Sequence, residues 1–114
     1  MSFAANVRTN GQLVVVELVG EIDGAADEAL NAQYESAIAS NPETVLLTFD
    51  NVSYMNSTGI ALIVGVLAEA RRSGRKIVVC GLSDHYKEIF EITRINDFVT
   101  VYDDEQAAVA GATG

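Results

Sequence analysis

The chain has 114 residues, of which 49% are hydrophobic, with a net charge of −9 and a single proline. This length and composition predict one domain around one hydrophobic core and exclude an intrinsically disordered chain. No apolar run reaches the roughly 18 residues that a membrane span requires, and the N-terminus lacks a signal-peptide pattern. Because its one cysteine, Cys80, cannot form an internal disulfide, we expect a cytoplasmic protein.

Charged residues are unevenly distributed along the chain. Residues 1–70 carry nine acidic side chains and one basic side chain, whereas residues 71–76 hold four of the seven basic ones. Nucleic-acid binding requires a dominant basic surface, so we expect no nucleic-acid partner. The acidic excess has two interpretations, which are a partner protein with a basic face and simple solubility.

Signals for strands and helices alternate along the chain. An Asn-Gly pair at 10–11 predicts a hairpin, and Pro42 and Gly74 are typical of positions where helices end. Continuous β-branched apolar segments predict buried strands, and apolar residues at helical spacing predict helices. The expected elements are strands at 7–9 and 13–18, a helix from 23 or 24 that ends at 40–43, a strand at 44–50, a helix at 57–73, a strand at 76–81, a helix at 84–92, a strand at 98–102, and a helix at 104–110 before a frayed tail. This order predicts an α/β domain with a mixed sheet of about five strands flanked by about four helices.

No pattern of an enzyme or a metal site is recognisable. The chain has one histidine, His85, and it has no Cys-x-x-Cys motif, no His-Glu-x-x-His motif and no Gly-rich phosphate loop. A triad of Ser57, His85 and a carboxylate stays open as an alternative, but the sequence around Ser57 lacks the Gly-x-Ser-x-Gly elbow that exposes a nucleophile. We therefore expect no catalytic activity, no metal and no cofactor. His85 is expected on a helix surface, and Cys80 is expected to be an inert hydrophobic residue in a strand.

The segment "NSTG" at 56–59 stands before a strongly apolar stretch, which predicts a helix packed deep in the domain. Asn56, Ser57 and Thr58 are all good N-cap residues, each worth about 1 kcal/mol over alanine, yet a helix needs only one cap. One interpretation is a plain helix start. The other is a switch, because a rigid helix N-terminus with an exposed hydroxyl would suit a phosphate. From the residues alone, both interpretations stay open.

Three segments carry a family resemblance. They are "LVGEID" at 18–23, "VLLTFDNVSYMNSTGIALIVG" at 45–65 and "GRKIVVCGLSDHYKEIFEITRINDFVTVYDDEQAAV" at 74–109. Through them the chain resembles STAS domains of the anti-sigma factor antagonist family over about residues 5–110. The resemblance implies one STAS domain over 1–114 that is not an enzyme. It also implies a regulator that, when dephosphorylated, binds a serine-kinase anti-sigma factor and frees the sigma factor. A phosphatase resets the phosphorylated form.

The resemblance also implies roles for individual residues. It makes Ser57 the phosphoacceptor and Thr58 a cap or a hydrogen-bonding neighbour. Gly59 would allow close approach of the backbone. Asp23 matches a family Asp in the loop beside the site, although an N-cap for the first helix is an equal interpretation. The expected partner-binding residues are Asp23, Met55, Asn56, Ser57, Thr58 and Gly59.

Two features of this segment leave alternatives open. Met55 and Tyr54 would flank the contact surface, or they would belong to the core. Asn56 stands where the family usually has Asp; it can still cap a helix, but it carries one negative charge less. This departure puts the identity of the partner in question. The alternative function is a STAS scaffold subunit without a phosphoswitch, in a stress-signalling or transport assembly.

Overall fold

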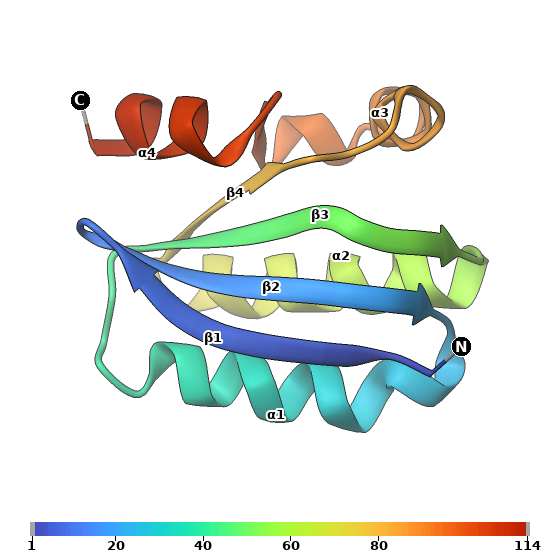
Figure 1. The fold of residues 1–114 in the computed structure, drawn as a ribbon, viewed down its shortest axis with the longest axis horizontal. Coiled ribbons are helices and arrows are strands. Elements are labelled where there is room, and N and C mark those ends of the chain that lie inside the picture. The colour runs from blue at the N-terminus through green and yellow to red at the C-terminus, as the bar shows by residue number, and fades with distance from the viewer. Residues whose placement is uncertain (1, 114) are drawn as a thin grey trace.

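A five-stranded mixed sheet forms the centre of the structure, a computed structural model that describes residues 2–113 (Figure 1). The strands lie in the sheet in chain order, and they are β1 (Ala4–Asn10), β2 (Leu13–Ile22), β3 (Thr44–Met55), β4 (Lys76–Cys80) and β5 (Thr100–Tyr102). β1 and β2 pair antiparallel, and every later neighbour pairs parallel. The helices are α1 (Asp27–Ile38), α2 (Ser57–Arg72), α3 (Asp84–Ile92) and α4 (Glu105–Thr113), with short 3-10 turns at Gly24–Ala26 (η1) and Ile95–Asp97 (η2). The predicted α/β architecture is confirmed.

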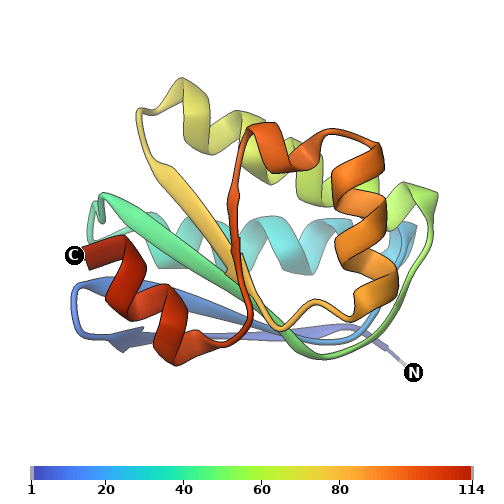
Figure 2. The ribbon, with the colours of Figure 1, turned by 90° about the horizontal axis from the view of Figure 1, so that it is seen from above.

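Helices cover both faces of the sheet. α1 and α2 lie on one face and α4 lies on the other. In Figure 1 the strands lie between α4 and α1, and in Figure 2 α4 lies in front of the strands. Alternate residues of the central strands serve the two cores. The larger core includes Val16, Leu47, Phe49 and Val79, and the smaller one beneath α4 includes Leu13, Val15, Leu46, Val78 and Ala108. Because both faces are buried, these strands read as continuous apolar runs.

β3 is longer than the sequence predicts. The apolar run at 44–50 marks only its buried first part, whereas the strand continues to Met55 through exposed residues. It continues because β2 also runs on to Ile22, and the two strands still pair at Glu21–Tyr54 and Ile22–Met55, after two register shifts. Local hydrophobicity does not predict this exposed end of β3, because the end is held by pairing with β2, a segment distant in the sequence.

Other element boundaries also differ from the predictions. Asn10 pairs with Leu13, so the hairpin loop is Gly11–Gln12, and Gly11 has the left-handed φ of +62° that favours glycine. β5 begins at Thr100 instead of residue 98, because η2 occupies 95–97. The expected frayed tail is wrong as far as Thr113, where α4 ends. Residue 114 lies outside the described residues.

The composition of α2 suggested a helix that is buried on most sides, but the structure buries only one side of it. One stripe, which includes Ile63, Val66 and Ala70, is buried. The opposite side exposes Ala61, Val64, Gly65 and Ala68. The exposed residues are mostly small, which explains why composition alone overestimated the burial. Within residues 2–113, no helix has the length and apolar character needed to cross a membrane.

Candidate functional site at the start of α2

The first turn of α2 is packed directly against the end of β2. The Asn56 backbone N–H donates a hydrogen bond to the Ile22 carbonyl oxygen at 3.3 Å. A Cβ atom added to Gly59 would lie 1.8 Å from that same oxygen, so only glycine fits at this position. The close backbone approach expected at Gly59 is therefore present. It holds the helix start in one place relative to the sheet.

Asn56 is the N-cap of α2, and Ser57 and Thr58 are the first two residues of the helix. Asn56 has an extended backbone, and its side-chain oxygen accepts a hydrogen bond from the Gly59 N–H at 2.8 Å. Both hydroxyl-bearing residues are exposed, and neither hydroxyl has a hydrogen-bond partner among residues 2–113. Within residues 2–113, Thr58 is therefore neither the cap nor the hydrogen-bonding neighbour that the resemblance implied. One residue caps the helix, and two hydroxyls are left facing solvent.

The Asp23 loop lies beside this helix start. The Asp23 carboxylate accepts a hydrogen bond from the Ala25 N–H at 3.0 Å and so caps the short turn η1, which leads into α1. A Cβ atom on Gly24 would lie 3.6 Å from the Thr58 side-chain methyl carbon. Asp23 itself is half-buried. Asp23 thus caps η1, whereas Ala26 is the N-cap of α1, and the loop that follows Asp23 approaches Thr58 through Gly24.

Met55 belongs to the core. Its side chain is only 4% exposed and packs in the larger core cluster, so it is not available as a surface contact. Tyr54 alternates to the other side of β3 and is 49% exposed. Of the two residues expected to flank the contact surface, only Tyr54 is exposed.

Tyr86 of α3 is hydrogen-bonded to the backbone immediately before the start of α2. This residue was not identified from the sequence. Its hydroxyl accepts a hydrogen bond from the Met55 N–H at 2.8 Å and donates one to the Met55 carbonyl at 3.3 Å. These bonds tie α3 to the last residue of β3, immediately before the N-cap. A tyrosine in an amphipathic helix has no local signal that distinguishes this role from ordinary packing.

The groups that could support catalysis lie elsewhere or are inert. His85 is exposed on α3, with its ring edge-to-face against Tyr86 at a centroid distance of 4.9 Å. Cys80 is buried in β4, and burial raises the pKa of its thiol to about 12, so the thiol stays protonated at neutral pH. Among residues 2–113 there is no group of three His, Cys, Asp or Glu side chains that could hold a metal ion.

Comparison with known proteins identifies the family of this chain. A profile of the STAS domain matches residues 4–108. The chain belongs to the STAS domain family. The anti-sigma-B factor antagonist of Staphylococcus aureus is 28% identical to this STAS domain over 101 residues, which are 89% of this chain and 94% of that protein.

Solved structures agree with the fold of this STAS domain. The anti-sigma factor antagonist SpoIIAA in its unphosphorylated form superposes with a TM-score of 0.72 at 21% identity, over 96% of this chain and 97% of that one. The Bacillus SpoIIAA in its phosphorylated form gives a TM-score of 0.71 at 22% identity, over 96% and 99%. At these identities the likeness establishes the fold.

Proposed function

We propose that this STAS domain is an anti-sigma factor antagonist that acts in the cytoplasm. In its dephosphorylated form it binds a serine-kinase anti-sigma factor and thereby frees the sigma factor. Phosphorylation of Ser57 by that kinase ends the binding, and a phosphatase restores it. The proposal is supported by the names of the relatives, which are anti-sigma factor antagonists, and by SpoIIAA, a structural neighbour with a phosphorylated form.

The observation that supports the proposal most directly is that Asn56 caps α2 while Ser57, the next residue, is exposed. Since Asn56 caps the helix, the Ser57 hydroxyl is free for modification without loss of the cap. A phosphate there would sit at the positive end of a helix of 16 residues, which favours negative charge. The domain is therefore expected to tolerate the modification.

The partner would not tolerate it. A like-charge contact at 4 Å costs about 4 kcal/mol at an effective dielectric of 20. Burying the phosphate in a contact shaped for a hydroxyl adds a desolvation cost. Since about 1.4 kcal/mol corresponds to a tenfold change in affinity, half of the charge term is enough for a switch.

The proposed contact surface surrounds Ser57. It comprises Asp23, Asn56, Ser57, Thr58 and, in place of the buried Met55, the exposed Tyr54. Gly59 would contribute through the fixed position of its backbone. Asn56 in place of the family's Asp preserves the cap and removes one charge. We therefore expect Asn56 to alter which partner binds, compared with family members that have Asp here, and to leave the architecture of the site unchanged.

The test is phosphorylation by the serine-kinase anti-sigma factors of the same organism. Wild type, Ser57→Ala and Thr58→Ala are incubated with ATP and each kinase, and the products are analysed by intact mass and tandem mass spectrometry. We expect one phosphate on Ser57 in wild type and in Thr58→Ala, and none in Ser57→Ala. Phosphate on Thr58 would contradict the assignment. A protein that no kinase modifies, but that joins a larger assembly, would be the scaffold alternative.

A further inference from the structure

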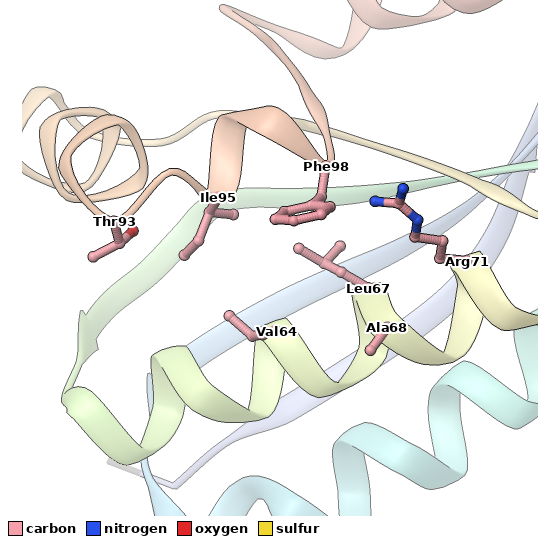
Figure 3. A pocket seen from close by; sticks show the side chains of 7 residues that line it. All are labelled: Val64, Leu67, Ala68, Arg71, Thr93, Ile95 and Phe98. Carbon is pink, nitrogen blue, oxygen red and sulfur yellow. The ribbon is translucent and has the colours of Figure 1, made fainter.

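An apolar groove of about 220 Å³ lies between the second half of α2 and the segment that connects α3 to β5 (Figure 3). Val64 and Leu67 of α2 face Ile95 and Phe98 across it. Val64 is 42% exposed and Phe98 is 59% exposed, so two of the four large exposed hydrophobic side chains among residues 2–113 line this one groove. The Arg71 guanidinium stands at its end, 5.1 Å from the centroid of the Phe98 ring.

The groove continues into a second hollow of basic character. That hollow shares Leu67, Arg71 and Phe98 with the groove and adds Arg75 and Lys76. It also touches Asp97, whose carboxylate is already paired with Arg94 at 3.0 Å. Together the two form one surface with an apolar floor and a cationic end, which we call the α2–β5 groove.

The cations of the α2–β5 groove differ from the other basic residues of the chain. Each of the others has a carboxylate partner at 3.2 Å or less; they are Arg8, Arg72, Lys87 and Arg94. Arg71, Arg75 and Lys76 have no such partner among residues 2–113. Arg75 is held only by neutral acceptors, which are the Asn41 side-chain oxygen and the Pro42 carbonyl. In a chain with 16 acidic side chains, the unpaired cations thus gather at one groove.

We infer that the α2–β5 groove binds an acidic, amphipathic peptide segment of a partner protein. Apolar side chains of such a segment would cover Val64 and Phe98, and its carboxylates would meet Arg71, Arg75 and Lys76. Charge complementarity of this kind sets which partner binds and how fast it associates. A basic segment would be repelled at the cationic end of the groove.

The groove is separate from the proposed phosphorylation site. Ser57 and Arg71 lie at opposite ends of α2, which places them about 21 Å apart along a helix that rises 1.5 Å per residue. The inference therefore does not rest on the proposed function. Both surfaces can be engaged at once, which would let one domain join two proteins.

The test is selection from a displayed library of random 12-residue peptides on immobilised wild-type protein. We expect enrichment of sequences that combine two or more Asp or Glu residues with two large apolar residues. A labelled peptide of the enriched type is then titrated by fluorescence anisotropy. Arg71→Glu and Phe98→Ala should each weaken its binding at least about fivefold, a loss that only a minority of interface residues cause when they are truncated. Lys76→Glu offers a second charge reversal that leaves the apolar floor intact.

Arg72→Glu is the matched control, because Arg72 is adjacent to Arg71, is already paired with Glu69 at 2.6 Å and does not line the groove. It should change the binding less than about twofold. Failure to enrich acidic peptides, or equal binding by Arg71→Glu and Arg72→Glu, would overturn the inference. Self-association that Arg71→Glu abolishes and Arg72→Glu keeps would assign the groove to a second copy and also overturn it. The Arg71→Glu substitution should leave the phosphorylation of Ser57 unchanged, because the two residues lie at opposite ends of α2.

Discussion

The backbone of Gly59, at the start of α2, rests on the carbonyl group of Ile22, at the end of β2. No Cβ atom fits between them, and the Asn56 N–H is bonded to the same carbonyl oxygen. Since Asp23 follows Ile22 directly, these contacts fix the start of α2, which carries Ser57 and Thr58, beside the Asp23 loop.

This contact predicts opposite effects of alanine at two glycines of α2. Gly59→Ala should lower the free energy of unfolding by about 3 kcal/mol or more, because the new methyl group would overlap the Ile22 carbonyl. Gly65→Ala should raise it by about 0.5–1 kcal/mol, because nothing lies within 4 Å of the new methyl group and alanine favours the helix. Urea unfolding of both variants measures the difference. Equal stabilities would mean that the close approach does not exist.

Asn56 should behave as a cap whose charge is not needed for folding. Asn56→Ala should lower the free energy of unfolding by about 1 kcal/mol, since the Gly59 N–H loses its acceptor. Asn56→Asp should retain the wild-type stability, because Asp caps as well as Asn and suits the positive helix end. Thermal unfolding of the pair tests this. If Asn56→Asp lost as much stability as Asn56→Ala, the side-chain amide would have a further structural role.

A negative charge at Ser57 should abolish partner binding while the fold persists. We expect Ser57→Ala to bind the kinase like wild type, and Ser57→Asp to bind at least about tenfold more weakly. Authentic phosphate should have a larger effect than Asp, since it carries more charge. Calorimetry measures the affinities, and circular dichroism checks the fold. Tight binding by a folded Ser57→Asp would refute the switch.

The Asp23→Asn substitution can distinguish a role of Asp23 as a cap from a role in contacting the partner. Asp23→Asn keeps an acceptor for the Ala25 N–H, so the free energy of unfolding should change by less than about 0.5 kcal/mol. If the carboxylate meets a basic group of the partner, the affinity and the phosphorylation rate should both fall, and the association rate should lose part of its salt dependence. Wild-type binding and phosphorylation of this variant would reduce Asp23 to a cap.

The ion pair of Arg8 with Glu105 should make the attachment of α4 sensitive to acid. Glu105 accepts hydrogen bonds from Arg8 at 2.7 Å and from Asn10 at 2.7 Å, and the bond from Arg8 is the main cause that lowers the pKa of Glu105 from 4.5 to about 2. A lowered folded-state pKa stabilises the fold above the unfolded-state pKa, and this contribution is lost as pH falls through the folded-state pKa. The relevant window is therefore pH 4.5 down to about 2.

Glu105→Gln should consequently be less stable than wild type near neutral pH. We expect a difference of about 1 kcal/mol or less, because the Arg8 side chain is 40% exposed and water screens the pair. The difference should shrink as pH falls below 4.5 and vanish once pH has passed through about 2. Urea unfolding across this range measures it, with Glu88→Gln as a control on an exposed carboxylate of α3. A difference that does not depend on pH would show that the hydrogen bond, and not the charge, holds α4.

The amino-acid sequence by itself determined the order and type of the elements and the position of the candidate site. The helix expected at 84–92 begins and ends at those residues in the structure, because Ser83 is a cap with a local partner, the Tyr86 N–H. The central strands were predictable because burial on both faces demands unbroken apolar runs. Asn56, Ser57 and Thr58 could be placed at a helix start because capping depends on neighbours along the chain.

Only the tertiary structure decided what each of those residues does. Three capping candidates became one cap because the chain is extended at Asn56, where its backbone meets Ile22 from a distant strand. Met55 became a core residue and Tyr54 a surface residue because pairing with β2 extends β3 to this point. The α2–β5 groove exists because η2 brings Ile95 and Phe98 over α2. Each of these outcomes depends on contacts between segments far apart in the chain, and local periodicity carries no record of such contacts.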